Sequence, residues 1–266
     1  MLRDITLGQY YPGESRIHRL DPRLKIICTF VYIISLFLVR DFMGFAIEAL
    51  FLGLVIFVSK VPLRFILKGL KPVFLIIIFT ITVNMFMTKG RILVQIGFLS
   101  ITQQGLYNAM FMGLRLVLLI IGSSLLTLTT KPINLTDGIE RLLSPFRRIG
   151  VPAHELAMMM TIALRFIPTL LEETDKIMKA QMARGADFES GNIIHRAKSL
   201  IPLLVPLFIS AFRIAQDLAM AMEARCYQGG DSRTRMNAML LKRQDVVAGF
   251  MMLAFFAVVI VQAYVI

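Results

Sequence analysis

The chain has 266 residues, of which 57% are hydrophobic, and its formal net charge is +12. So large an apolar fraction, gathered in long runs, excludes an ordinary soluble globular domain and indicates an integral membrane protein. The two cysteines, Cys28 and Cys226, exclude a disulfide framework. The charge is compatible with nucleic-acid binding, but the basic residues flank the apolar runs, a pattern typical of the cytoplasmic side of a membrane protein.

Residues 1–23 are polar and rich in turn-forming residues, without the basic-then-apolar pattern of a cleavable signal peptide. Asp21 followed by Pro22 predicts a helix start, because Asp caps a helix and Pro fits its first position. Apolar runs at residues 24–39 and 42–58 predict a hairpin of two membrane spans, each near the lower limit of about 17 residues.

A basic loop at residues 60–71 precedes a third predicted span at residues 72–87. Residues 92–101 are too short to span as a helix, and we expect them to be extended or re-entrant. A fourth span is predicted at residues 106–129 and a last one at residues 246–266. The distribution of basic residues over the loops places the N-terminus of this five-span arrangement in the cytoplasm.

Two ionisable residues lie inside predicted spans, where they are costly to bury. For Glu48 we expect structural pairing with another helix, and transport chemistry is the alternative. Arg115 has Gly113 and Gly122 as neighbours that permit close helix contacts, and we expect it to snorkel or to be paired.

Residues 131–244 contain charged residues too often for the pattern of a span, and they predict three further helices near residues 136–148, 152–184 and 193–227. Prolines lie within the last two, and we expect them to bend both helices (Pro168, Pro202 and Pro206). Their N-terminal halves are apolar and their C-terminal halves amphipathic, as in helices that lie along a membrane. The alternative is that residues 200–212 belong to another span.

The predicted fold class is therefore an all-α integral membrane protein with about five transmembrane helices and three cytoplasmic, bent, amphipathic helices. We expect an N-terminal membrane region at residues 1–130, a cytoplasmic domain at residues 131–244 and a terminal span at residues 245–266. We therefore expect the chain to be a multi-pass protein of a cell membrane.

The sequence contains no phosphate-binding loop, no His-Glu-x-x-His pattern and no paired-cysteine zinc pattern. Its three histidines, His18, His154 and His195, are far apart and lack metal-ligand spacing. We therefore expect no metal and no cofactor on this chain.

Two short segments repeat each other in the polar part of the chain: Ala183-Arg184-Gly185 and Ala224-Arg225-Cys226. Their arginines are 41 residues apart (225 − 184), and each ends a predicted helix. A cation at this position interacts favourably with the helix dipole, by about 0.3–1 kcal/mol, and that local role alone explains it. The alternative is a docking site, because an exposed arginine beside small residues can bind a partner's carboxylate in bidentate fashion.

Methionines are concentrated on the same helices: Met158, Met159, Met160, Met178, Met220 and Met222. Ordinary packing explains them, and so does an adaptable surface for a membrane partner, since Met is flexible and polarizable.

The paired Ala-Arg segments resemble the signature of the T component, the transmembrane scaffold of energy-coupling factor (ECF) transporters. Further matching segments are Tyr-Tyr-Pro-Gly at residues 10–13, His-Arg-Leu-Asp-Pro-Arg at 18–23, Glu-Arg-Leu-Leu-Ser-Pro at 140–145 and Ala-Leu-Arg-Phe-Ile-Pro at 163–168. Cys226 departs from the family's usual glycine. If that glycine caps the helix in a left-handed conformation, Cys226 should disturb the cap, and Gly229 and Gly230 could take over the chain reversal.

The resemblance implies an L-shaped subunit in the inner or plasma membrane of a prokaryotic cell. Its coupling helices link two cytoplasmic ABC-type ATPases to a membrane-embedded, vitamin- or micronutrient-binding S component. ATP and Mg²⁺ would be bound by the ATPases. Residues 183–185 and 224–226 are then the ATPase contacts, and the six methionines are the S-component contact. Two alternatives remain: a conventional ABC importer permease, and a membrane enzyme or channel that uses Glu48 and Arg115.

Overall fold

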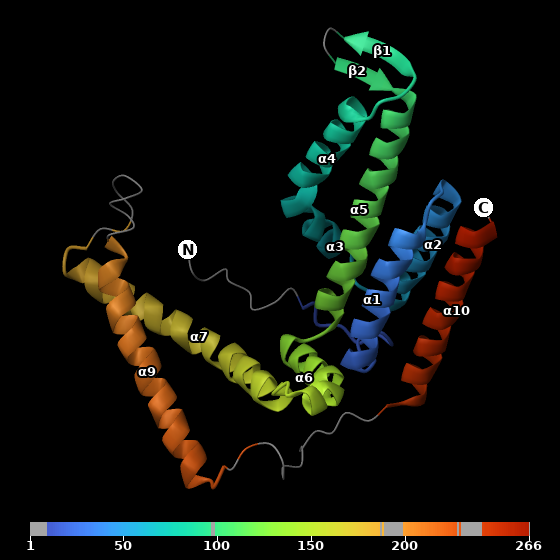
Figure 1. The fold of residues 1–266 in the computed structure, drawn as a ribbon. Coiled ribbons are helices and arrows are strands. Elements are labelled where there is room, and N and C mark those ends of the chain that lie inside the picture. The colour runs from blue at the N-terminus through green and yellow to red at the C-terminus, as the bar shows by residue number, and fades with distance from the viewer. Residues whose placement is uncertain are drawn as a thin grey trace. The chain divides into compact units, whose positions relative to one another are not determined.

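The computed structural model describes residues 10–96, 99–186, 188, 199–227, 229 and 241–265, which are almost entirely helical (Figure 1). The elements in chain order are α1 (Pro22–Leu38), α2 (Phe42–Ser59), α3 (Leu63–Leu70), η2 (Lys71–Val73), α4 (Phe74–Met87), β1 (Ile92–Ile96), β2 (Leu99–Thr102), α5 (Gln103–Thr129), α6 (Pro132–Leu143), η3 (Ser144–Ile149), α7 (Ala153–Ala183), α9 (Ile201–Ala224) and α10 (Arg243–Val265). The predicted all-α class is confirmed.

The described residues fall into two compact units. Residues 8–138 and 238–266 form one, here called the bundle unit, which contains α1 to α5 and α10. Residues 139–237 form the other, here called the helix-pair unit, which contains η3, α7 and α9.

The core of the bundle unit consists of apolar side chains from α1, α2, α3, α5 and α10. Leu36, Phe45, Ile66 and Val259 are almost fully buried within it. Most other large apolar side chains of these helices are exposed, as expected where lipid replaces a protein neighbour.

Polar contacts join the helix ends at one end of this bundle. The Lys25 ammonium donates to the carbonyls of His18 (3.2 Å) and Thr129 (2.9 Å) and to Thr130 Oγ1 (3.3 Å). Thr129 is the last residue of α5, so Lys25 satisfies a carbonyl that has no partner within its helix. Asp245 accepts from the backbone N–H groups of Asp21 and Lys242, which ties the start of α10 to the start of α1.

The segment between α4 and α5 forms a two-stranded antiparallel hairpin, with Ile96 opposite Leu99 and Ile92 opposite Thr102. This confirms the extended alternative for residues 92–101. The Thr102 hydroxyl accepts from the Gly105 N–H at 3.0 Å and caps α5. The same hydroxyl donates to the Thr88 carbonyl after α4, so one side chain joins both helix ends.

The predicted basic loop at residues 60–71 is wrong, because α3 and η2 occupy most of it. Arg64, Lys68 and Lys71 recur at helical spacing, and Ile66 is buried on the opposite side of α3. The charges therefore mark one side of an amphipathic helix rather than a loop.

Among the described residues, six helical segments are long and apolar enough to cross a membrane: Phe42–Ser59, Leu63–Met87, Gln103–Thr129, Ala153–Ala183, Ile201–Ala224 and Arg243–Tyr264. Four of them match predicted spans. α1, with 17 residues, lies near the lower limit for a span. α7 and α9 also have the length and composition of membrane spans. That they lie along the membrane and do not cross it therefore stays a prediction.

Candidate functional site

The end of α7 is a Schellman cap, in which two backbone hydrogen bonds close the last helical turn. The Ala186 N–H donates to the Gln181 carbonyl at 3.0 Å, and the Gly185 N–H donates to the Met182 carbonyl at 2.9 Å. Gly185 has φ +87°, a left-handed conformation that glycine adopts without steric cost. Arg184 is thus held as the last residue before the chain turns away.

The end of α9 repeats this cap residue by residue. The Tyr227 N–H donates to the Met222 carbonyl at 3.0 Å, and the Cys226 N–H donates to the Glu223 carbonyl at 2.8 Å. Cys226 has φ +55° and so takes the left-handed position that Gly185 takes in α7. The expected disturbance of the cap by Cys226 is therefore wrong: the cysteine itself adopts the conformation, for which a side chain costs about 1–2 kcal/mol. Gly229 is also left-handed, and Gly230 lies outside the described residues.

Both arginines are exposed, as are their neighbours Ala183, Gly185, Ala224 and Cys226. Neither Arg184 nor Arg225 forms an ion pair with another residue of the part of the chain that the structure describes. Each guanidinium therefore keeps its planar set of donors available for a carboxylate.

The two caps lie at opposite ends of the α7–α9 pair, because the helices run in opposite directions. Gln181 near the end of α7 donates through Nε2 to the carbonyl of Pro202 at the start of α9, at 3.4 Å. At the other end, the Tyr227 hydroxyl after α9 contacts Met158 Sδ near the start of α7, at 3.1 Å. α9 has 24 residues, so the two arginine caps are separated by about 36 Å along the pair. Figure 1 shows the two helices meeting where α7 ends and α9 begins.

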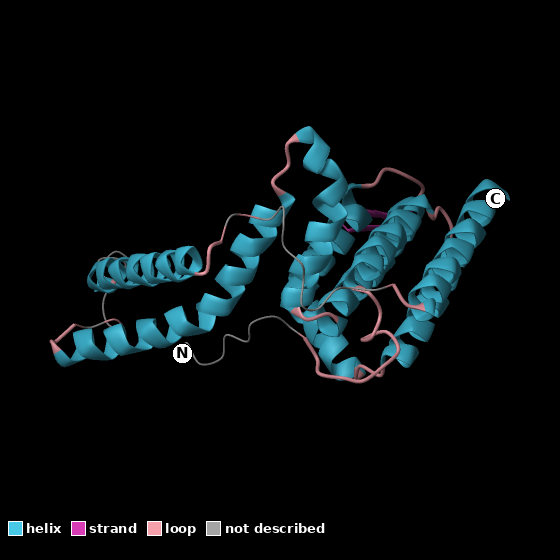
Figure 2. Cartoon of the chain, turned by 90° about the horizontal axis from the view of Figure 1, so that it is seen from below, coloured by secondary structure: helices cyan, strands magenta, loops and turns pink. Residues whose placement is uncertain are grey.

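Both helices contain an interior proline, Pro168 in α7 and Pro206 in α9, whereas Pro202 lies in the first turn of α9. Proline removes one main-chain hydrogen bond and bends a helix. Figure 2 shows α7 as a curved helix. The part of the predicted third helix at residues 193–198 lies outside the described residues.

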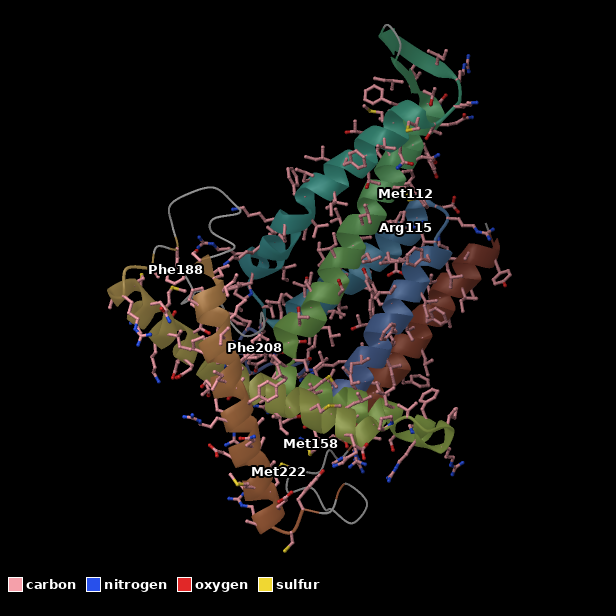
Figure 3. All side chains as sticks on the ribbon, turned by 60° about the vertical axis from the view of Figure 1, so that its left-hand side comes forward. Met112, Arg115, Met158, Phe188, Phe208 and Met222 are labelled. Atoms are coloured by element: carbon pink, nitrogen blue, oxygen red, sulfur yellow. The ribbon has the colours of Figure 1, made fainter. Side chains whose placement is uncertain are left out.

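The methionines of the predicted membrane-partner surface differ in exposure. Met159 and Met220 are 56% and 59% exposed. Met158, Met160, Met178 and Met222 are half-buried, and Met158 is the acceptor of the Tyr227 hydroxyl. Figure 3 labels Met158 and Met222. The pair buries few of its own residues: Ala153, Ala157 and Leu203.

The first half of α9 carries a set of exposed apolar residues that are not among the predicted site residues. Val205, Phe208, Ile209 and Phe212 are each more than half exposed. The sequence of residues 200–212 indicates this surface, because the stretch is apolar on every face, and a helix without a polar face needs lipid or protein around it.

Glu48 and Arg115, the basis of the enzyme or channel alternative, lie in the bundle unit and form no ion pair there with described residues. Arg115 Nη2 donates to the Val39 carbonyl after α1 at 2.9 Å, and its guanidinium lies over the rings of Phe37, Phe45 and Phe111. This confirms that Arg115 is paired, with a backbone carbonyl and aromatic rings rather than with a carboxylate. Figure 3 labels Arg115 on α5. Glu48 is fully buried, and neither carboxylate oxygen has a hydrogen-bond partner among described residues, so the expected pairing is wrong.

The described histidines make local contacts and gather no metal-binding group. His18 Nδ1 is 2.7 Å from Ser15 Oγ, and its Nε2 is 3.1 Å from the Tyr11 carbonyl. His154 Nδ1 is 3.2 Å from Glu140 Oε1. Within the described ranges no three His, Cys, Asp or Glu side chains could hold a metal ion, and His195 lies outside them.

The apolar helices and the duplicated arginine caps define a multi-pass, all-α membrane protein with two separate, exposed helix ends. Residues 13–236 match the family of the cobalt transport protein CbiQ. The chain is 62% identical to the energy-coupling factor transporter transmembrane protein EcfT of Thermosediminibacter oceani over 93% of both chains. It is 56% identical to the EcfT of Ruminiclostridium cellulolyticum over 100% of this chain and 99% of the relative, and 50% identical to that of Bacillus subtilis over 92% and 93%.

The chain therefore belongs to the family of transmembrane components of energy-coupling factor transporters. The family resemblance predicted from the sequence is confirmed.

Proposed function

We propose that this chain is the scaffold that links two cytoplasmic ABC-type ATPases to a membrane-embedded S component, which binds a vitamin or another micronutrient. The chain itself catalyses no reaction and binds no cofactor. ATP and Mg²⁺ are bound by the ATPases, and the substrate is bound by the S component. The N-terminus lies in the cytoplasm.

One observation supports this function above the others: the same cap presents an exposed arginine at each end of the α7–α9 pair. Two ATPases need two docking points, and a separation of about 36 Å leaves room for one folded domain at each. Arg184 and Arg225 each bind an acidic groove of one ATPase, where the small side chains of Ala183 and Ala224 permit close approach.

The test is reversal of each arginine, Arg184→Glu and Arg225→Glu, in the complete transporter. A like charge facing an acidic groove costs several kcal/mol, so we expect at least about a hundredfold loss of ATPase recovery with the chain. Uptake should be lost while the membrane part remains folded. Lys179→Glu on α7 and Arg213→Glu on α9 are matched controls, since both positions are exposed and lie before the caps.

Normal ATPase recovery and uptake with both reversals together would contradict the docking role. Equal losses from the two control reversals would contradict it as well, because they would indicate a general effect of charge. The conventional permease and the enzyme or channel are disfavoured by the family membership and by Arg115, whose guanidinium is engaged by a carbonyl and three rings.

A further inference from the structure

The bundle unit contains a cavity of about 550 Å³, a size within the range of about 300–1,000 Å³ that is usual for ligand pockets. Its walls come from the first part of α1, the second half of α2, the last turns of α5 and the first half of α10. All four stretches lie at the same end of the bundle, where Lys25 and Asp245 join the helix ends.

The walls of the cavity are apolar, and its charged residues are all basic. Leu24, Val55, Leu125 and Val247 are typical wall residues. The charged residues of the lining are Arg16, Lys25 and Arg243, with no carboxylate among them. The three donors of the Lys25 ammonium already have acceptors. Arg16 and Arg243 are exposed and form no ion pair within the described ranges, so the cavity offers two guanidinium groups to an anion.

The apolar depth of the cavity matches one leaflet of a bilayer. Its lining on α10 extends from Arg243 to Met252, a stretch of ten residues that is about 14 Å long. A bilayer's hydrocarbon core is about 30 Å thick, so one leaflet is about 15 Å. One helical turn beyond Met252, Phe255 stacks on Phe51 of α2 with ring centroids 3.9 Å apart and lies outside the lining.

Wall residues on two helices also face outward. Leu54 of α2 is 49% exposed, and Val247 and Met251 of α10 are 59% and 52% exposed. A ligand can therefore enter from the bilayer, between α2 and α10, without crossing water.

We propose that this cavity binds one anionic phospholipid. The lipid comes from the leaflet at the end of the bundle where Arg16 and Arg243 lie. An acyl chain lies along α10 down to the Phe51–Phe255 stack, and the phosphate lies at the end lined by Arg16 and Arg243. An ammonium-bearing or uncharged amphiphile fits less well, because the lining contains basic residues and no acidic one.

The chain has no tryptophan, which permits a direct test in vesicles. The full-length variant Met251→Trp carries a fluorophore in the cavity, and Phe250→Trp carries one on the same helix at a 75% exposed position outside the lining. Both are reconstituted in phosphatidylcholine with acyl-brominated phosphatidylglycerol or phosphatidylcholine as quencher. We expect Trp at position 251 to be quenched by the anionic lipid at a mole fraction at least about fivefold lower, and Trp at position 250 to be quenched equally by both.

The double variant Arg16→Gln/Arg243→Gln should abolish this preference, because each of the two cations contributes about fivefold to it. The matched double variant Arg19→Gln/Lys242→Gln removes the same charge from neighbouring exposed positions outside the lining and should keep it. Native mass spectrometry of the two double variants, both without the introduced tryptophan, should show that Arg19→Gln/Lys242→Gln retains phosphatidylglycerol and Arg16→Gln/Arg243→Gln does not.

Equal quenching of position 251 by the two lipids would overturn the proposal. So would a loss of preference in the matched variant, which would indicate general surface charge. Absence of quenching by either lipid would also overturn it, since the cavity would then be closed to the bilayer or filled by protein.

Discussion

Cys226 adopts the left-handed backbone conformation that Gly185 adopts at the equivalent position of the other cap, one residue after the arginine that ends each helix. The two caps share the same pair of hydrogen bonds although only one has the glycine that favours them. The cap of α9 is therefore formed at a steric cost that the cap of α7 does not have.

Replacing Cys226 by glycine should relieve this cost. We expect Cys226→Gly to raise the free energy of unfolding by about 1 kcal/mol, because glycine adopts φ near +55° freely. Thermal unfolding of the detergent-solubilised chain, followed by circular dichroism, measures the change. Cys226→Ala removes the thiol but keeps Cβ and should leave stability unchanged, and Gly185→Ala should lower it. A destabilising Cys226→Gly would show that the sulfur contributes more than the conformation costs.

The thiol of Cys226 also reports the side of the membrane on which the caps lie. It is exposed, whereas Cys28 is half-buried on α1. We expect a membrane-impermeant maleimide to label Cys226 in inside-out vesicles and not in right-side-out vesicles, since the caps are proposed to be cytoplasmic. Cys226→Ala should remove the signal. Labelling from the outside alone would reverse the proposed orientation.

Exposed methionines of the helix pair should affect the S component and not the ATPases. Met159→Lys with Met220→Lys places two cations on a surface proposed to be covered by apolar groups. We expect recovery of the S component to fall by at least about tenfold, with ATPase recovery unchanged. Met43→Lys, at an exposed methionine at the start of α2, is the control. Loss of the ATPases instead would place these methionines at the other interface.

Glu48 and Arg115 should respond differently to neutral substitutions. Glu48→Gln removes no hydrogen bond to a described residue and should leave uptake intact. Arg115→Gln loses the bond to the Val39 carbonyl and the contact with three rings, and we expect it to cost about 2 kcal/mol of stability. Melting curves and vesicle uptake measure both. Loss of uptake in an assembled Glu48→Gln complex would assign Glu48 a role in transport.

His18 should make stability depend on pH. Burial is the main cause that lowers the pKa of His18 below its ordinary 6.5, and the nearby Lys25 charge acts in the same direction, against the contact with the Tyr11 carbonyl. A depressed pKa favours the neutral ring in the folded protein, so its stabilising contribution is present above about pH 6.5 and is lost as the pH falls through the folded pKa. The melting temperature should decrease between about pH 7.5 and about pH 5. His18→Gln should flatten this dependence, and an unchanged slope would exclude His18 as its source.

Apolar run length alone predicted most spanning helices to within a few residues, because lipid demands about 20 apolar residues in sequence. The same reasoning missed α3, because Arg64 and Lys68 interrupt any long apolar run there. The four-residue spacing of these two basic residues is nevertheless the spacing of one face of a helix.

Contacts between distant residues could not be predicted. The bond from Asp21 to Asp245 joins residues 224 apart. For the site, the repeated Ala-Arg pattern identified both arginines and Gly185 signalled the cap. The cap at Cys226 had no such signal, because a left-handed conformation is uncommon for cysteine. The opposite placement of the two caps required the contacts of Gln181 and Tyr227.

The small buried area of the α7–α9 pair has a consequence for the amount of this protein in a cell. Ala153, Ala157 and Leu203 contribute little apolar burial, while Phe208 and Phe212 are 62% and 67% exposed. A copy synthesised without partner subunits therefore presents a weakly held helix pair to quality-control proteases. We expect its steady-state abundance to follow the supply of its partners, so that excess copies are degraded rather than accumulated.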